Sequence, residues 1–572
     1  MNPNPHPNPL LSRIAPLWPW ACAALSGFLL ALAFPGWNQG WLVWIALTPL
    51  VAAVWFSPRP ARRAWLRNAL LGYVAGYVFF SVTFSWLGSP LADLFKNSWL
   101  VCLPLLLALY LALFLAFWSW FIALLPRGNT TFLTSSRNIG IAFLAACAWT
   151  AQEWTRGWLF GGFGWNGLGI ALHQNTALVQ AADLAGVPGL TFLVAFANLI
   201  ALITVRRFIA EVGRTRIRPH WDFSVMMASV VATFSYGVHA LQHPVDPPGQ
   251  SIIPLSIAAI QPDIRESEKW SAETAQHIYE RYDALTALAF AHSPQLLIWP
   301  EAATLNDLND QDTLHHLQDL VAHTNSAFIF GSFFSPAGDG EYNIAACLTD
   351  QGQTLQVYRK MHLVPFGEYI PLRHSFPLFA KIAGELVPGD LRPGNEFTVF
   401  HAAGLQIAPL ICFEDTDADE TRRFVGRGAQ LLVNITNDSW FGHSPGSAQH
   451  LANATFRAIE NRRPLVRAAN TGITCIIDSE GRTVLDLRNS DGTPFLEGIL
   501  CGTVSVPRDG PLTFYTRFGD WLPIGSAIIA LISLIIPFAA RFLSQSATRR
   551  GGGGGEPGLE GGRANRQSAI SP

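Results

Sequence analysis

Long apolar runs limit what this chain can fold into more than any other feature of its sequence. A helix needs about 20 predominantly apolar residues to cross the hydrocarbon core of a bilayer. Eight stretches approach that length and composition: residues 17–34, 39–56, 69–88, 98–125, 139–155, 187–205, 223–241 and 523–540. Only 14% of the residues are charged, against about 25% in a typical soluble protein. The sequence therefore predicts a polytopic α-helical membrane protein.

Basic residues are distributed unevenly between the loops that join these runs, and this distribution predicts the orientation. Eleven arginines lie in alternate loops, at 57–68, 126–138 and 206–222, whereas the other loops hold only Lys96 and Arg156. Positively charged residues are enriched in cytoplasmic loops. We therefore expect both termini in the cytoplasm and the segment between the seventh and eighth runs outside it. The Gly-rich, aromatic segment 156–175 also falls outside, either along the membrane surface or as a plain loop.

The chain divides into four parts on this basis. They are a seven-span transmembrane region (1–242), an extramembrane domain (243–516), a C-terminal transmembrane helix (517–545) and a disordered cytoplasmic tail (546–572) that contains a Gly run. In the extramembrane domain, β-rich runs alternate with helical patterns, which indicates a layered α/β fold. The predicted strands are 252–260, 295–299, 327–333, 354–358, 405–411, 430–436 and 474–478, and the predicted helices are 271–291, 312–324 and 446–461.

Three chemically complementary residues follow three of these strands directly. Glu301 follows LLIWP, Lys360 follows LQVYR and Cys412 follows LQIAPLI. Each alone has an ordinary explanation, as a capping carboxylate, a surface lysine or a small core residue. Together they provide a nucleophilic thiol, a base to take its proton, and a cation to stabilise the thiolate and the oxyanion on an attacked carbonyl. The three residues therefore indicate acyl transfer without a metal or a cofactor.

At these residues the sequence resembles the nitrilase superfamily of carbon–nitrogen hydrolases, whose members use a Glu-Lys-Cys triad in an αββα sandwich. More narrowly, it resembles the apolipoprotein N-acyltransferase family. The stretches that carry the resemblance are IWPEAA, YRKMHLVPFGEYIP, APLICFED, NITNDSWFG and HLANATFRAIENRRPLVRAANTGIT. The number of spans and the position of the outer domain match as well, so the resemblance covers nearly the whole chain.

The resemblance implies a two-step reaction in the bacterial inner membrane, with the catalytic domain in the periplasm. The thiolate takes an acyl chain from a membrane phospholipid, and the resulting thioester passes it to the N-terminal amine of a diacylglyceryl-cysteine apolipoprotein. By motif position, the resemblance also assigns supporting or substrate-binding roles to Glu368, Glu414, Phe413 and Trp270. Phe413 stands where a tyrosine is expected, so a hydroxyl is absent there.

Other function classes remain as alternatives or are disfavoured by the sequence. The net charge of −2 gives no basic field for nucleic acid, and no Cys/His cluster suggests a zinc site. A serine hydrolase would use Ser444 in the G-x-S-x-G pattern at 442–446, but residues 437–441 separate that pattern from the preceding strand. A membrane-tethered amidase would keep the same triad and use water as the acceptor. A transporter would need more polar groups within the spans.

Overall fold

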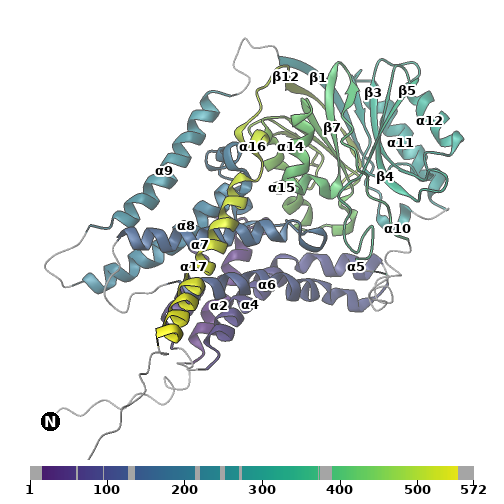
Figure 1. Ribbon diagram of the computed structural model, residues 1–572. Coiled ribbons are helices and arrows are strands. Elements are labelled where there is room, and N and C mark those ends of the chain that lie inside the picture. The colour runs from purple at the N-terminus through teal and green to yellow at the C-terminus, as the bar shows by residue number, and fades with distance from the viewer. Residues whose placement is uncertain are drawn as a thin grey trace, which may run out of the picture.

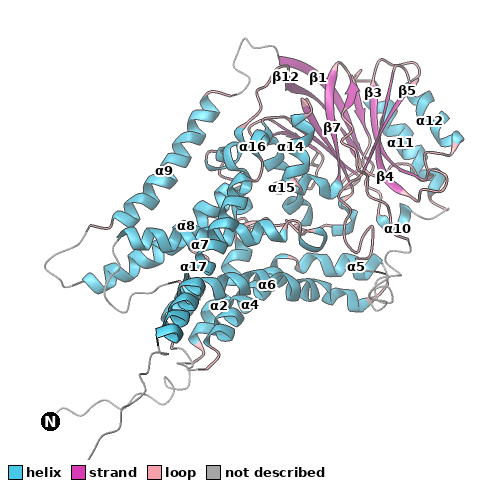
Figure 2. Cartoon of the chain, in the orientation of Figure 1, coloured by secondary structure: helices cyan, strands magenta, loops and turns pink. Residues whose placement is uncertain are grey.

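A computed structural model describes residues 16–58, 62–94, 96–125, 135–212, 219–244, 252–269, 273–371, 373 and 389–551, with side chains in the last helix to residue 536. A bundle of long helices forms one half of the molecule, and a layered α/β domain packs on it (Figure 1). Figure 2 shows that all the strands lie in the second half.

The helical half contains nine α-helices and several short 3-10 turns among the described residues. The α-helices are α2 (Trp18–Leu32), α3 (Thr48–Phe56), α4 (Ala64–Thr83), α5 (Gly88–Leu94), α6 (Leu103–Leu124), α7 (Ser135–Arg156), α8 (Ala182–Glu211), α9 (Trp221–Gln242) and α17 (Trp521–Gly551). Helix α17 continues past residue 545, where the tail was expected to begin, and residues 552–572 lie outside the described part of the chain.

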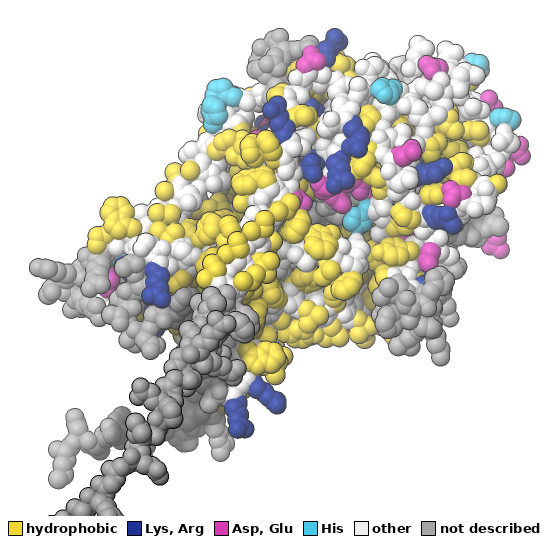
Figure 3. Space-filling view, viewed as in Figure 1, with side chains coloured by type: hydrophobic (Ala, Val, Ile, Leu, Met, Phe, Trp, Pro, Cys, Tyr) yellow, Lys and Arg dark blue, Asp and Glu magenta, His cyan; other side chains and the backbone are white. Residues whose placement is uncertain are grey.

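Hydrophobic side chains cover this half on the face shown in Figure 3, while charged and histidine side chains gather over the α/β domain. Three helices are long and apolar enough to cross a membrane, at Ser98–Leu124, Leu178–Glu211 and Trp221–Gln242, and the bent pair Ala64–Thr83 with Ser85–Asp93 makes up to four. Trp18–Leu32, Gly40–Phe56 and Trp521–Ile536 are shorter apolar helices. The protein is therefore a membrane protein, and the count of eight spans stays a prediction.

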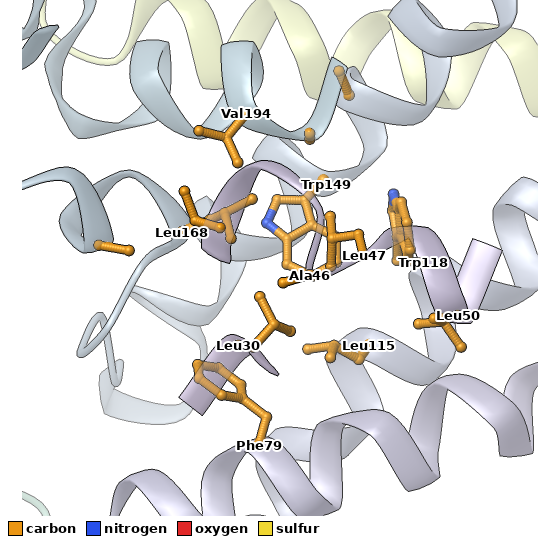
Figure 4. Close-up of a cluster of buried hydrophobic side chains, with 14 of the residues drawn as sticks. Leu30, Ala46, Leu47, Leu50, Phe79, Leu115, Trp118, Trp149, Leu168 and Val194 are labelled. Atoms are coloured by element: carbon orange, nitrogen blue, oxygen red, sulfur yellow. The ribbon is translucent and has the colours of Figure 1, made fainter. Parts of the chain in front are cut away.

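The helices pack around a common apolar core (Figure 4). It includes the edge-to-face pair Trp118 and Trp149, whose ring centroids lie 4.7 Å apart at an interplanar angle of 85°. The buried Trp118 Nε1 donates to the carbonyl of Ala145 at 2.8 Å, so the one polar atom of this indole is satisfied away from water. Trp118 on α6 and Trp149 on α7 thereby join two neighbouring helices.

The α/β domain contains two six-stranded mixed sheets. Their strand orders are β12-β1-β2-β3-β4-β5 and β11-β10-β9-β8-β7-β6. The strands are β1 (Ile252–Gln261), β2 (Leu296–Ile298), β3 (Ala327–Phe334), β4 (Tyr342–Thr349), β5 (Thr354–Arg359), β6 (Phe400–Ala402), β7 (Leu405–Ile411), β8 (Leu431–Thr436), β9 (Leu465–Ala469), β10 (Cys475–Ile477), β11 (Thr483–Asp486) and β12 (Gly498–Pro507). In each sheet three central strands are parallel, namely β1-β2-β3 and β7-β8-β9.

Side chains alternate between the two faces of the strands, as the pleat requires. On β1, Ile257 and Ala259 belong to the core between the two sheets, whereas Ala258 and Ile260 belong to a separate core against the outer helices. Those outer helices are α11 (Ala275–Phe290) and α12 (Gln311–Val321). Helices α14 (Ala418–Gly426) and α15 (Gly446–Asn461) cover the other sheet. The domain is therefore the expected αββα sandwich.

Helix α15 lies between the second sheet and the membrane helices and is buried along its whole length. Ala454 and Ala458 pack in the same apolar cluster as the second sheet, whereas Phe456 and Ile459 pack in the core of the helical half. The segment 156–175 lies at the same junction, where Trp165 and Asn166 are buried. It is therefore a packed connection between the two halves rather than an exposed loop.

Candidate active site

The three sequence-predicted residues each follow the end of a strand of the sandwich, and two of these strands run in the same direction. β2 and β3 are parallel, and β5 runs in the same direction because two antiparallel pairings, β3 with β4 and β4 with β5, separate it from β3. Glu301 follows β2 and Lys360 follows β5, so both lie at the same edge of the first sheet. Cys412 follows β7, a central strand of the facing sheet.

Lys360 lies between two carboxylates. Its Nζ is 2.9 Å from Oε1 of Glu368 and 3.4 Å from Oε1 of Glu301, and its side chain is 1% exposed. Burial lowers the pKa of Lys360, but Glu368 and Glu301 more than offset this and hold it above its ordinary value. The lysine is therefore a fixed cation at neutral pH. Sequence reasoning placed Glu368 on the lysine side of the site only by resemblance, and the geometry places it there directly.

Asn343 on β4 completes this arrangement, and the sequence analysis missed it. Its Nδ2 donates to Glu301 at 2.9 Å and to Glu368 at 2.8 Å. Lys269 on α10 (Glu266–Lys269) is a second residue that was missed, and its Nζ donates to the backbone carbonyl of Glu301 at 3.2 Å. A polar residue within the apolar run YNIAACL is the one signal that could have pointed to Asn343.

Cys412 sits at a sharp turn directly after β7. Its φ is +53°, a left-handed value that is uncommon for a residue with a Cβ. Burial raises the pKa of the Cys412 thiol well above its ordinary value, Glu301 raises it further, and Lys360 acts in the opposite direction. At rest Cys412 is thus a thiol, and its sulfur could attack a carbonyl only if a base accepted the thiol proton. Glu301 and Lys360 are the two charged groups that act on it most strongly.

Glu414 is fully buried and does not point to solvent. One of its oxygens, Oε1, accepts hydrogen bonds from the hydroxyl of Tyr358 at 2.8 Å and from the amide of Met361 at 2.7 Å. The other, Oε2, accepts from the amide of Ile411 at 2.7 Å. This carboxylate therefore joins the loop after Lys360 to Ile411, the residue that precedes Cys412.

Phe413 belongs to an aromatic layer supplied by the membrane half. Its ring stacks on Trp165 at a centroid distance of 5.9 Å and an interplanar angle of 11°, and it lies 6.3 Å from Phe163. A ring without a hydroxyl suits this apolar position. Trp270, the remaining residue assigned by resemblance, lies outside the described residues. The signal for Trp165 was the aromatic, Gly-rich character of segment 156–175, which carried no assigned role.

The G-x-S-x-G pattern does not have the geometry of a serine nucleophile. β8 ends at Thr436, and a 3-10 turn over Asp438–Phe441 intervenes before the pattern. The Oγ of Ser444 accepts from the amide of Gly446 at 3.2 Å, a local contact at the start of α15. Ser444 is therefore a loop residue, as the sequence spacing indicated.

Among the described residues, one group of three side chains has ligand atoms close enough to hold a metal ion: His362, Asp417 and Glu420, within 4.8 Å of one another. These atoms already have partners. His362 contacts Asp417 at 3.1 Å and the carbonyl of Gly161 at 3.1 Å, and Glu420 bonds to Tyr358 at 2.8 Å. This group is well explained as a structural contact between the two halves.

Protein-family models and curated relatives match nearly the whole chain. The model of the apolipoprotein N-acyltransferase N-terminal domain matches residues 26–200, and the carbon–nitrogen hydrolase model matches 256–505. The apolipoprotein N-acyltransferase of Geobacter metallireducens is 34% identical over 525 residues, which cover 89% of this chain and 94% of that protein. That of Rhodopseudomonas palustris is 30% identical over 565 residues, covering 92% of this chain and 97% of that protein. That of Thermotoga maritima is 30% identical over 523 residues, covering 90% and 93%.

These matches confirm the resemblance on which the sequence analysis relied. They extend through both halves of the molecule and include the nitrilase-like sandwich that carries Glu301, Lys360 and Cys412. The chain belongs to the apolipoprotein N-acyltransferase family.

Proposed function

We propose that this protein moves an acyl chain from a membrane phospholipid to the N-terminal amine of a diacylglyceryl-cysteine apolipoprotein, through a thioester on Cys412. The observation that carries the proposal is the Lys360 ammonium, held between Glu301 and Glu368 in a buried site that faces a strained cysteine turn. Such a site can activate a thiol and stabilise an oxyanion without a metal.

In the first half-reaction, Glu301 accepts the proton of the Cys412 thiol as the sulfur attacks the ester carbonyl of the phospholipid. The oxyanion that forms lies within reach of the Lys360 ammonium, which stabilises it. The bond between the carbonyl carbon and the glycerol oxygen then breaks, and Glu301 returns the proton to that oxygen. The products are a lysophospholipid and the acyl thioester.

In the second half-reaction, the α-amine of the apolipoprotein attacks the thioester carbonyl. Glu301 accepts the proton that the amine loses, Lys360 again stabilises the oxyanion, and the carbon–sulfur bond breaks. The proton returns to the sulfur of Cys412. An amide replaces the original ester, so the enzyme is regenerated without a cofactor.

The proposal includes a topology. The arginine asymmetry supports a periplasmic catalytic domain at 243–516, bounded by seven spans at 1–242 and a last span at 517–545, with a cytoplasmic tail at 546–572 in the bacterial inner membrane. Export-dependent reporters fused after His243 should be active, and those fused after Val212 should be inactive. An active cytoplasmic reporter at 243 would overturn this orientation.

Trapping of the acyl-enzyme tests the chemistry. Purified protein given phospholipid with radiolabelled acyl chains, and no amine acceptor, should stop after the first half-reaction and carry one label on Cys412. Neutral hydroxylamine should release the label, because it cleaves a thioester faster than an oxygen ester. Cys412→Ala should take up no label, whereas Ser444→Ala and Cys501→Ala should label normally. Label that persists in Cys412→Ala would identify a different nucleophile.

The same experiment separates transfer from hydrolysis. A membrane-tethered amidase would release free fatty acid steadily without any amine, since water would resolve the thioester. The acyltransferase should hold the thioester until a lipopeptide with a free N-terminal amine is added, and it should then form the N-acylated product. Rapid release of fatty acid in the absence of amine would therefore favour the amidase.

A further inference from the structure

Four fully buried charged residues lie together behind the nucleophile. They are Asp415 beside Cys412, Asp438 in the turn after β8, His450 on α15 and Arg467 on β9, and each is 0% exposed. Arg467 lies 2.9 Å from Asp415 and 2.8 Å from Asp438. His450 lies between the same two carboxylates, with Nε2 2.9 Å from Asp415 and Nδ1 2.9 Å from Asp438. We refer to these four residues as the buried charge cluster.

Charge balance determines the protonation of His450. The two carboxylates carry two negative charges and Arg467 carries one positive charge, so a neutral imidazole would leave one unpaired charge in the protein interior, which is costly. Burial lowers the pKa of His450 and the guanidinium of Arg467, 2.9 Å from Nδ1, also opposes protonation. Asp415 and Asp438 outweigh both and raise this pKa above its ordinary value. His450 is therefore an imidazolium, and the cluster is neutral.

The cluster contacts the backbone of the nucleophile. The carbonyl oxygen of Cys412 lies 3.3 Å from His450 Nε2 and accepts a hydrogen bond from Asn434 Nδ2 at 3.1 Å. A left-handed conformation is unfavourable for a residue with a Cβ, and it persists only where surrounding contacts fix it. The turn at Cys412 has φ +53°, and these two donors are contacts that fix it.

The membrane half encloses the other face of the imidazolium. The Trp165 ring lies 5.2 Å from the His450 ring and also stacks on Phe413, the residue after the nucleophile. Phe441 lies 5.9 Å from His450 at an interplanar angle of 77°. The neighbours of His450 on these sides are aromatic rings. The charged groups that face it from the elements packed against it are Asp415, Asp438 and Arg467.

We propose that His450 is a positioning residue for the nucleophile. Its imidazolium, held by Asp415 and Asp438, binds the Cys412 carbonyl and fixes the left-handed turn that presents the thiol to Glu301 and Lys360. Its positive charge also prevents the two carboxylates from disfavouring the thiolate. This inference rests on the proposed role of Cys412 and adds to it the group that sets the conformation and ionisation of that cysteine.

The test uses the full-length chain in detergent and two measurements. The first is the rate of acyl-enzyme formation with vesicles of phosphatidylethanolamine and phosphatidylglycerol that carry radiolabelled acyl chains. The second is the pH dependence of Cys412 alkylation by iodoacetamide, followed by mass spectrometry of the Cys412 peptide, because the thiolate is the reactive form. His450→Gln keeps an N–H donor but removes the charge. His443→Gln is the matched control, since this histidine is exposed and stacks on Phe495 away from the cluster.

We expect acylation of His450→Gln to fall about tenfold or more, since misplacement of a reacting group by a distant change is costly. The alkylation midpoint should rise by about one pH unit, the size of shift that a nearby unbalanced charge causes. Adding Asp438→Asn to His450→Gln makes the cluster neutral again and should return the midpoint toward that of the unsubstituted protein. His443→Gln should change neither measurement.

The outcomes are distinguishable. If the unsubstituted protein takes no label on Cys412, the proposed function fails. If it labels, and His450→Gln labels within about twofold of it with an unchanged alkylation midpoint, the positioning role fails while the proposed function stands. Should His450→Gln not fold, the charge-neutral double variant gives the decisive comparison. In that variant, a reduced acylation rate with an unchanged alkylation midpoint supports the positioning role of His450. An acylation rate equal to that of the unsubstituted protein overturns it.

Discussion

Helices α4 and α6 meet at glycines, which have no side chain, whereas the sandwich buries charged side chains behind Cys412. A Cβ added to Gly72 would lie 2.3 Å from the carbonyl oxygen of Leu115, and one added to Gly76 would lie 2.8 Å from the Cα of Ala112. In the sandwich, the space behind Cys412 is filled by the buried charge cluster, in which every charge has a partner of opposite sign.

The difference follows from what surrounds each half. Lipid is as apolar as the helices, so helices associate through close backbone approach and van der Waals contact. The active site must instead hold charges in fixed positions before the reaction begins, because preorganised charge stabilises the transition state. Changes in the helical half should therefore affect stability most, and changes at the catalytic edge should affect activity most.

The largest losses of activity are expected at the charged residues that face the thiol. Glu301→Gln removes the base and should lower the acylation rate by about 10²–10⁴-fold. Lys360→Ala removes the oxyanion donor and should lower it by about 10²–10³-fold. Both variants should still be extracted as monodisperse protein. Glu497→Gln is the control, because this carboxylate is 49% exposed and pairs with Arg281 on the surface. Near-full activity in either of the first two variants would remove that residue from the mechanism.

Glu414→Ala should reduce both activity and stability. It is therefore an exception to the separation between stability effects in the helical half and activity effects at the catalytic edge. Without this carboxylate, the amides of Ile411 and Met361 lose their acceptor, and an unsatisfied buried donor costs about 1–3 kcal/mol. We expect the labelling rate to fall about 10–100-fold through a lower kcat, since the residue positions Lys360 and Cys412 without touching substrate. Thermal unfolding in detergent should shift to a lower temperature. A higher KM with an unchanged kcat would instead indicate that Glu414 binds substrate.

Gly76→Val should lower stability and leave chemistry intact. The added side chain would overpack the contact between α4 and α6, at a cost of about 1–3 kcal/mol. Thermal unfolding in detergent should show a lower Tm, while the labelling rate per folded molecule should stay within about twofold. Gly140→Val is the matched control on α7, because an added Cβ there meets nothing within 4 Å. Equal stability of the two variants would show that close approach at Gly76 does not hold the helices together.

The sequence predicts β1, β2, β3, β5, β7, β8 and β10, whereas it misses β4, β6, β9, β11 and β12. β1, β7 and β8 were expected almost at their observed bounds, and α15 was expected over its full length. β9 was missed because Arg467 interrupts its apolar pattern, and that arginine is buried only because the cluster neutralises it. β11 was missed because its side chains are mostly exposed. Strands with a buried charge or a solvent-facing surface therefore lack the pattern on which such predictions depend.

The candidate site also divides into residues that a local pattern indicates and residues that it does not. Glu301, Lys360 and Cys412 could be proposed as a candidate site because each follows a recognisable strand and the three have complementary chemistry. Asn343 and His450 could not, because their partners lie on segments that meet only in the folded sandwich. Trp165 lies still further away in the chain, on a segment that belongs by sequence to the membrane half. Contacts between the halves depend on how α15 packs, and no local pattern specifies that packing.

The smallest effect is expected at the contact between the halves, and it should depend on pH. His362 Nδ1 lies 3.1 Å from Asp417, and its Nε2 lies 3.1 Å from the carbonyl of Gly161 in the membrane half. Both partners are acceptors, so the imidazolium satisfies both contacts. Burial lowers the pKa of His362, but Asp417 more than offsets this and raises it above its ordinary value. Burial raises the pKa of Asp417, but the bonds from His362 hold it below its ordinary value.

These directions set the pH window of the effect. The contribution of His362 is complete below its unfolded pKa and is lost as pH rises through the raised folded pKa. The contribution of Asp417 is complete above its unfolded pKa and is lost as pH falls through the lowered folded pKa. His362→Gln should therefore destabilise the protein near pH 5–6, by about 0.2–1 kcal/mol for a partly exposed pair, and the difference should disappear at pH 9. Thermal unfolding of both proteins in detergent across this range measures it. A stability difference that is the same at pH 5.5 and pH 9 would mean that His362 contributes through packing rather than through its charge. The junction would then resemble the helical half more than the catalytic edge.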